Sequence, residues 1–141
     1  MSEKELQEKI LSYRLLEART DSTVKQRDFL ISKIMELQST LKSIDELEKS
    51  EGEILFPVGG EAYKTGKVVN DDKMVVEIGA NVALEKSTKE GKAMLEKRKG
   101  ELESSVNGLQ QELIRIYEIM NKLGPEIQNL ADKNQNIPQA G

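Results

Sequence analysis

The chain has 141 residues, a formal net charge of -4 and no cysteine, histidine or tryptophan. The lack of cysteine and histidine excludes a disulfide framework, a thiolate nucleophile, a Cys-ligated metal and a Ser-His-Asp triad, while catalysis by carboxylates alone stays open. The negative charge argues against a nucleic-acid partner, because phosphate backbones need a basic surface. The charged start is unlike a signal peptide, and no stretch approaches the roughly 18 apolar residues that span a bilayer. We therefore expect a cytoplasmic protein with no membrane partner.

Residues 2–50 contain no glycine or proline and are predicted to form one long helix. Ser2 and Glu5 have the spacing of a capping box, and Gly52 stands where a C-terminal cap belongs. The second half of this segment carries a heptad seam, formed by Leu30, Ile34, Leu37, Leu41 and Ile44. The seam is lost across residues 17–28, and a local looseness of the helix pair is one explanation.

Residues 87–132 are predicted to form a second helix of similar length, again with a capping box at Ser87 and Glu90. Its 4-3 spacing continues for about four heptads, which indicates a coiled coil. The seam residues are Leu102, Val106, Leu109, Leu113, Ile116, Met120, Leu123, Ile127 and Leu130. Pro125 lacks the backbone N–H that would bond the preceding turn, so a kink is expected there. The polar residues 133–141 are expected to be disordered.

Residues 53–86 have a different pattern, in which short β-prone runs alternate with turn signals. The predicted strands cover residues 53–58, 62–69, 73–78 and 82–85. Two consecutive hairpins between helices of equal length are best explained by an antiparallel pair, because the second helix then returns along the first. The predicted fold is therefore mainly α with a β insert, an antiparallel two-helix coiled coil joined by two β-hairpins.

The hairpins cannot stand alone in water, since isolated hairpins are marginal and open strand edges invite pairing with other chains. Because the helices use their apolar stripes on each other, we expect oligomerisation through the β insert. The alternative is a small sheet packed on the bases of its own helices in a monomer. The residues expected to form the assembly surface are Ile54, Phe56, Val58, Val69, Met74, Val76, Ile78, Val82 and Leu84.

The free end of the predicted arm carries more apolar residues than one seam can bury. At about 100° per residue, Leu6, Ile10 and Tyr13 cluster on one face. Leu11, Leu15 and Leu16 are expected to lie well off that seam. Exposed apolar patches usually mark interaction sites. The candidate polypeptide-binding residues are Leu6, Ile10, Leu11, Tyr13, Leu15, Leu16, Ile127 and Leu130. The alternative is a merely apolar helix end or a local contact with a third partner.

No motif indicates a cofactor or a metal. The run from Gly60 to Lys67 resembles a P-loop, but its glycines are six residues apart and Val68 replaces the Ser or Thr that would bind magnesium. The acidic residues near the end of the first helix lack EF-hand spacing and are interpreted as a solvated junction.

The arrangement resembles the prefoldin family. The segments that carry this resemblance are Glu53–Gly59 (EILFPVG), Gly66–Val69 (GKVV), Val75–Gly79 (VVEIG) and Val82–Lys86 (VALEK), which leads into the second helix. The resemblance covers essentially the whole chain, and two hairpins make it similar to the α-class subunit of archaeal type. The polar gap in the first helix is the one departure.

The resemblance implies a hexamer of two α and four β prefoldin subunits, whose hairpins form a double β-barrel platform. Six coiled-coil arms would then hold unfolded client proteins at their tips without ATP and pass them to a group II chaperonin. The competing hypotheses are a structural coiled coil that tethers one folded partner and, more remotely, a carboxylate enzyme.

Overall fold

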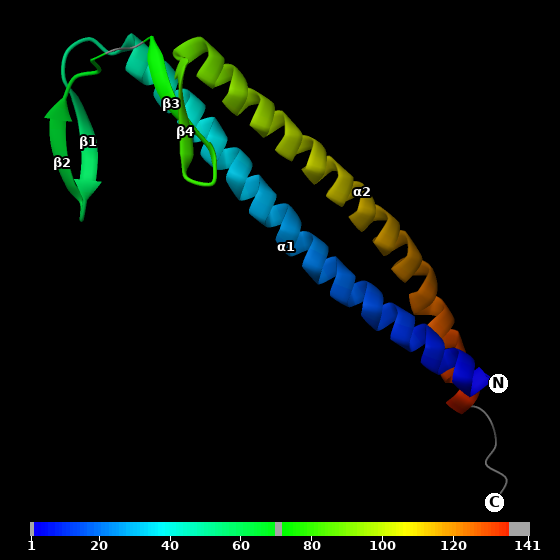
Figure 1. The fold of residues 1–141 in the computed structure, drawn as a ribbon. Helices are drawn as coiled ribbons and strands as arrows, with labels where there is room; N and C mark the ends of the chain where they lie inside the picture. Colours follow the sequence, from blue (N-terminus) through cyan, green and yellow to red (C-terminus); the bar gives the residue numbers. More distant parts are fainter. Residues whose placement is uncertain (1, 70–71, 136–141) are drawn as a thin grey trace, which may run out of the picture. The chain divides into compact units, whose positions relative to one another are not determined.

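The computed structural model describes residues 2–69 and 72–135 (Figure 1). Its elements follow the expected order: α1 (Ser2–Lys49), β1 (Ile54–Gly59), β2 (Ala62–Gly66), β3 (Lys73–Gly79), β4 (Val82–Ser87) and α2 (Thr88–Gln135). The predicted mainly α fold with two hairpins is confirmed. The hairpins form two separate two-stranded antiparallel sheets, so the single chain contains no closed barrel in the described residues. Neither helix in those residues is long and apolar enough to cross a bilayer.

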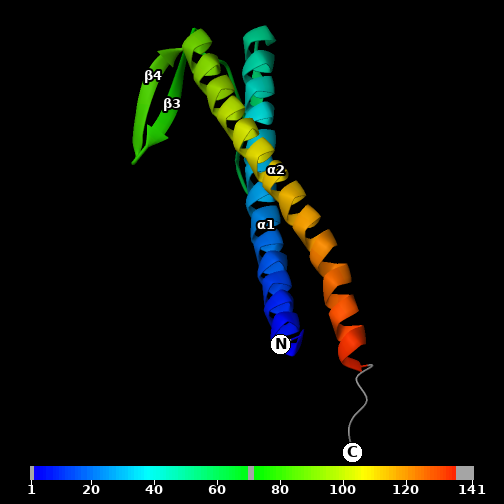
Figure 2. The ribbon, with the colours of Figure 1, turned by 90° about the vertical axis from the view of Figure 1, so that its right-hand side faces the viewer.

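The chain divides into two compact units, each made from both helices. The terminal unit combines the part of α1 up to Ile31 with the part of α2 from Ser104 onward. The central unit is residues 32–103 and contains both hairpins. In the terminal unit the start of α1 lies beside the end of α2, as the views in Figures 1 and 2 agree, so the two helix segments are antiparallel.

The predicted seam of α2 is confirmed by burial. None of its nine residues is exposed, and the most deeply buried are Leu113 (3% exposed), Ile116 (5%) and Val106 (7%). The helix begins as expected: Ser87 Oγ accepts a hydrogen bond from the backbone N–H of Glu90 at 3.1 Å, which is the N-cap contact. Heptad spacing in the sequence was therefore sufficient to find the buried face of this helix.

The ends of the helices differ slightly from the expected bounds. Residues 133–135 belong to α2, so the expected disorder is wrong for them, while residues 136–141 lie outside the described part. The helix α2 continues through Pro125 without interruption, and the kink expected at this residue stays a prediction. The helix α1 ends at Lys49, and the chain then turns through Gly52, whose φ is 85°. At the start of α1, the Ser2 side chain of the expected capping box lies outside the described part.

The least exposed line of α1 does not stop at residue 17, as the sequence suggested. It continues with heptad spacing through half-buried Leu16, Thr20 and Arg27, and Thr23 is 5% exposed. The polar gap is therefore a stretch in which polar side chains occupy the seam. Thr20 makes this tolerable because its Oγ1 donates to the Leu16 carbonyl at 2.9 Å and approaches Met120 Sδ at 3.8 Å.

The strand β2 is shorter than predicted. It ends at Gly66, which pairs with Ile54 at the beginning of β1. Within residues 2–69 and 72–135, no strand pairs with the chain beyond Gly66, because the segment before β1 has already turned away at Gly52. Val69, expected on a strand, therefore lies in the link between the hairpins and is 99% exposed.

The hairpin β3–β4 packs on α2 within its own central unit and lies beside the first turns of that helix in both ribbon views (Figures 1 and 2). Met74 lies against Gly91, where an added Cβ would sit 2.1 Å from its Sδ. Val76 is 4% exposed, and Arg98 donates to the Glu77 carbonyl at 2.8 Å. The expectation that the helices have no apolar surface to spare is therefore wrong for Met74 and Val76, because α2 covers this face of β3.

Candidate functional site

The candidate site is the apolar surface of the terminal unit. Leu11 is 59% exposed and Leu15 is 62% exposed, and both lie on α1. They stand one turn apart, roughly opposite the line of Tyr13 and Thr20 that faces α2. A helix pair buries one stripe of each helix, so these two leucines have no surface of α2 to cover them.

The remaining candidates divide between the seam and its margin. Leu6, Ile10 and Tyr13 are half-buried, as are Ile127 and Leu130 on α2. Leu16 was expected well off the seam, but it is half-buried in line with Thr20, so its predicted direction is wrong. The error arises because the true seam passes through polar residues that the apolar pattern could not reveal.

A shallow groove of about 300 Å³ runs between the two helices in this unit. Its lining residues are Ile10, Tyr13, Arg14, Glu17, Gly124 and Ile127. Three of them are predicted candidates, so the structure brings part of the set together around one depression. Leu11 and Leu15 lie outside it, and the terminal unit therefore offers an apolar groove and a separate apolar stripe on α1.

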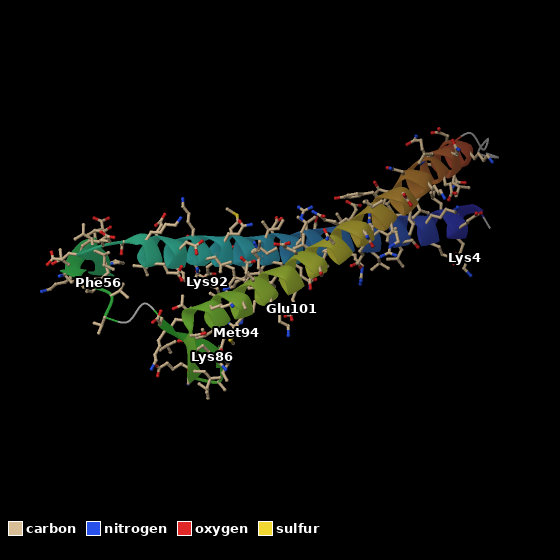
Figure 3. All side chains as sticks on the ribbon, turned by 90° about the horizontal axis from the view of Figure 1, so that it is seen from above. Lys4, Phe56, Lys86, Lys92, Met94 and Glu101 are labelled. Carbon is tan, nitrogen blue, oxygen red and sulfur yellow. The ribbon has the colours of Figure 1, made fainter. Side chains whose placement is uncertain are left out.

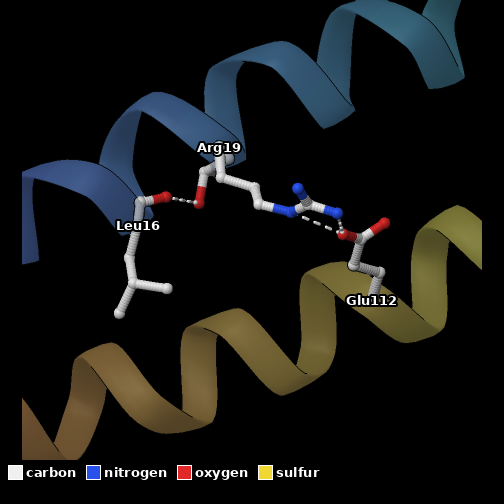
Figure 4. A network of polar contacts seen from close by, with 4 residues as sticks. Leu16, Arg19 and Glu112 are labelled. Carbon is white, nitrogen blue, oxygen red and sulfur yellow. Dashed lines mark hydrogen bonds and ion pairs between the residues drawn. The ribbon is translucent and has the colours of Figure 1, made fainter. Parts of the chain in front are cut away.

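Ion pairs between the helices hold this surface in place. Lys9 Nζ lies 2.5 Å from Glu126 Oε2, and this contact raises the pKa of Lys9 above its ordinary value, chiefly through the hydrogen bond. Arg19 donates from its guanidinium to Glu112 Oε1, with Nε at 2.7 Å (Figure 4). Both pairs are partly solvated, so each fixes the alignment of the helices more than it adds stability.

Sequence reasoning missed further exposed apolar residues in the terminal unit. Phe29 is 61% exposed on α1, and on α2 the exposed residues are Ile114 (56%), Ile119 (48%) and Tyr117 (44%). All three α2 residues lie off the heptad seam, and apolar residues off a seam are the sequence signal that could have predicted this exposed surface. They extend the apolar surface of the terminal unit along the helices, away from their free ends.

The hairpins carry a second exposed apolar surface. Of the predicted assembly residues, Val58 (58% exposed), Ile78 (48%), Val82 (47%), Phe56 (43%) and Leu84 (39%) are uncovered. Leu55, Tyr63 and Val75 are even more exposed, at 68%, 62% and 68%, and were missed because one face of each hairpin was considered. Figure 3 labels Phe56 on the β1–β2 hairpin.

Comparison with known proteins agrees with this architecture. The family model for prefoldin subunits matches residues 16–133. Prefoldin subunit alpha of Pyrococcus horikoshii is 24% identical over 92% of this chain and 90% of its own length. Prefoldin subunit alpha of Thermofilum pendens is 36% identical over 67% of this chain and 75% of its own length. A filamentous prefoldin from Methanocaldococcus jannaschii, solved by cryo-electron microscopy, has a TM-score of 0.70 at 25% identity and covers 82% of this chain and 97% of its own.

The chain belongs to the prefoldin family, a family of chaperones and not of enzymes. The resemblance to the two-hairpin alpha class, which the sequence suggested, is confirmed by the relatives named prefoldin subunit alpha. Prefoldin alpha subunits assemble into a multi-subunit prefoldin complex.

Proposed function

We propose that this chain is a cytoplasmic, ATP-independent holdase subunit that captures non-native polypeptides with the apolar surface of its terminal unit. The observation that carries the proposal is the exposure of Leu11 and Leu15 on the side of α1 that cannot pack on α2. A contiguous exposed apolar surface usually marks an interaction site. Unfolded clients expose apolar segments without a fixed sequence, which suits a stripe and a shallow groove better than a closed pocket.

Weak capture by one subunit becomes useful when several act together. An exposed leucine that becomes fully buried contributes about 1–2 kcal/mol, so one terminal unit holds a client loosely. Linked units raise the effective concentration of the second contact and so increase the overall affinity. No nucleotide is required, because the cycle consists of binding and release. In this proposal the client is then delivered to a group II chaperonin.

Multivalency in turn requires assembly, which we assign to the hairpins. The partners proposed are prefoldin beta subunits in an α2β4 hexamer, joined through the exposed residues and open edges of β1–β2 and β3–β4. Phe56→Asp or Ile78→Asp should prevent the hexamer while leaving helicity largely intact. Light scattering that shows normal hexamers with both substitutions would refute this part. A filament is the alternative outcome, because the similar prefoldin from M. jannaschii is filamentous.

Client capture is tested with a double variant, Leu11→Gln with Leu15→Gln, in the assembled complex. Glutamine keeps helix propensity, so the change removes apolar surface and little else. Met35→Gln is the matched control, because Met35 is 62% exposed on the same helix but belongs to the central unit.

We expect the double variant to suppress aggregation of a denatured client much less well, with roughly tenfold weaker binding for each leucine. The control should protect the client like the unmodified chain. Equal protection by all three would contradict capture by this stripe. A pull-down that recovers one native protein and no denatured clients would instead favour the tethering alternative.

A further inference from the structure

The terminal unit has two lateral sides, which the heptad positions of its helices define. With the least exposed positions of α1 labelled a and d, Ile10, Val24 and Ile31 stand at position e, beside the seam. In α2, Tyr117 stands at e and Ile114 at the adjoining position b. Antiparallel helices bring their e positions to one side of the pair and their g positions to the other. We call the first of these the e-side of the terminal unit.

The contacts between the helices confirm this division. Arg19 at position g of α1 donates to Glu112 at position g of α2, so this ion pair lies on the side opposite the e-side (Figure 4). The groove of about 300 Å³ lies on the e-side, because its lining includes Ile10 and Glu17 at e of α1 and Gly124 at e of α2. One lateral side is therefore closed by an ion pair, and the other is grooved.

The apolar surface is wider in the terminal unit than in the central unit. On the e-side of the terminal unit, Val24 and Ile31 are half-buried, and Ile114 and Tyr117 are 56% and 44% exposed. The central unit has polar residues at its e positions, which include Gln38, Asp45, Glu96 and Glu103. Apolar residues at a and d alone suit a two-helix pair, whereas a third apolar position is typical of helices in a larger bundle. The terminal unit thus has the pattern of a bundle that lacks one helix.

The geometry of the e-side favours a helix over an extended segment as its occupant. The two helices use their backbone N–H and C=O groups internally, so they offer no backbone partner to a bound chain. An extended segment would bury its own backbone groups unpaired against apolar side chains, which is costly. A helix satisfies its backbone internally and presents side chains only. The e-side extends from Ile10 to Ile31, about 30 Å at 1.5 Å per residue, which accommodates a helix of about 20 residues.

The charges on the margins of the e-side restrict which helix fits. On the α1 margin, Glu17 and Asp21 are exposed and form no ion pair with any residue that the structure describes. Asp28 is already ion-paired with its neighbour on α1, and Arg14 adds one positive charge nearer the free end. On the α2 margin, no e or b position from 107 to 131 carries a charged side chain. A complementary helix therefore has basic residues along the margin beside α1 and uncharged residues along the other.

We propose that the e-side binds a segment of a non-native polypeptide as an amphipathic helix, which completes a three-helix bundle with α1 and α2. This inference rests on the proposed holdase function and names the class of client segment. Short amphipathic helices are marginal in water and gain most of their stability from packing of the apolar face, so a segment of an unfolded client would fold on binding. A second copy of this chain fits less well, because it brings the same carboxylates and a net charge of -4.

The bound conformation is tested with two synthetic peptides of about 20 residues, matched to the length of the e-side. Both have the same composition of leucine, lysine and glutamine. In the first the leucines follow helical spacing with the lysines along one margin, and in the second the leucines alternate with polar residues, which favours a strand. By fluorescence anisotropy with the assembled complex, we expect the helical peptide to bind at least about tenfold more tightly. A proline in its middle should remove the difference. Equal binding of the two, or tighter binding of the alternating peptide, would overturn the helical mode.

The binding face is tested with Ile114→Gln. Ile119→Gln is the matched control, because Ile119 is 48% exposed at position g of the same helix. We expect Ile114→Gln to weaken binding of the helical peptide by about fivefold to tenfold, since roughly half of this side chain is still to be buried, and Ile119→Gln to change it little. Equal weakening by both would overturn the e-side as the binding face. Self-association of the complex through its arms that Ile114→Gln abolishes, measured by sedimentation, would overturn the proposal in favour of a second copy.

The charge preference is tested by replacing the lysines of the helical peptide with glutamates. The unmodified chain should prefer the lysine peptide, and the double variant Glu17→Lys with Asp21→Lys should prefer the glutamate peptide. An unchanged preference would overturn the predicted orientation of the bound helix. Protection of a denatured client is measured on the same samples. A complex that protects the client but binds all peptides equally refutes the helical mode alone, whereas a complex that binds the helical peptide as expected and fails to protect refutes the holdase function.

Discussion

Gly91 in α2 lies directly beneath the Met74 side chain, and its replacement by alanine tests whether β3–β4 packs on this helix. The new Cβ would stand 2.1 Å from Met74 Sδ and 2.6 Å from Cγ, both far inside van der Waals contact. The Met74 side chain would have to leave its present position. Gly100 offers a matched control in the same helix, because an added Cβ there meets no atom within 4 Å.

Both substitutions replace a helical glycine by alanine, and only Gly91→Ala also introduces a steric clash. Glycine to alanine inside a helix gains about 1 kcal/mol of stability through backbone entropy. Gly100→Ala should show that gain in full. At Gly91 the forced rearrangement costs about 1–3 kcal/mol, the usual cost of overpacking. We therefore expect Gly91→Ala to be about 1–3 kcal/mol less stable than Gly100→Ala.

The assay is urea unfolding of the two variants at equal subunit concentration, with Met74→Ala added in each background. Removing the Met74 side chain should cost less in the Gly91→Ala background than in the Gly100→Ala background, because the clash disappears with it. The amide hydrogen exchange of β3 and β4 should become faster in Gly91→Ala and stay unchanged in Gly100→Ala. Equal stabilisation by both alanines, with unchanged exchange, would show that β3–β4 does not rest on α2.

Three further predictions follow from the helix contacts. Lys92 Nζ lies 2.8 Å from Asp45 Oδ1, and Lys92 is labelled in Figure 3. The hydrogen bond between the two side chains lowers the pKa of Asp45 below its ordinary 3.8 and raises the pKa of Lys92 above its ordinary 10.5. The stabilisation from this pair should be constant between pH 3.8 and 10.5, the ordinary pKa values of the two groups. It should fall as the pH drops from 3.8 through the lowered pKa of Asp45, and again as the pH rises from 10.5 through the raised pKa of Lys92. Melting temperatures of Lys92→Met measured across pH should lack both of these decreases, and a profile identical to that of the unmodified chain would contradict the pairing. Thr23→Val should raise the free energy of unfolding by about 1 kcal/mol, because it places a methyl group of the same shape in a buried seam position, and a loss measured by urea unfolding would refute this reading. Arg19→Gln breaks the exposed pair with Glu112 and should change stability by less than about 1 kcal/mol, with the difference shrinking in high salt; a larger, salt-insensitive loss would contradict its solvated character.

The α2 seam and the two hairpins could be predicted from the sequence because each depends on local pattern. Nine apolar residues at heptad spacing determine which face of α2 is buried, and turn signals such as Gly59–Gly60 separate the strands. The seam of α1 through Thr20 and Thr23 could not be found in this way. Those positions are buried by the partner helix, and only the pairing with α2 shows that polar residues lie in register there.

The hairpins show the same division between local and tertiary information. Alternation in the sequence identified the faces of Phe56 and Val76 as apolar, but it could not reveal that one of two equivalent faces is covered. That difference arises because β4 leads directly into α2, whereas links of several residues flank the first hairpin. The directions of Leu11 and Leu15 were predictable from helix geometry, and the direction of Leu16 was not, because it depends on where the true seam runs.

Direct contact between client and subunit tests the account most closely. A photo-crosslinking residue placed at position 15, and in a parallel sample at position 35, reports which part of α1 touches a chemically denatured protein in the absence of nucleotide. We predict client adducts at position 15 that disappear when the client is native, and few or none at position 35. Equal labelling at both positions, or labelling at position 35 alone, would contradict capture by the terminal unit.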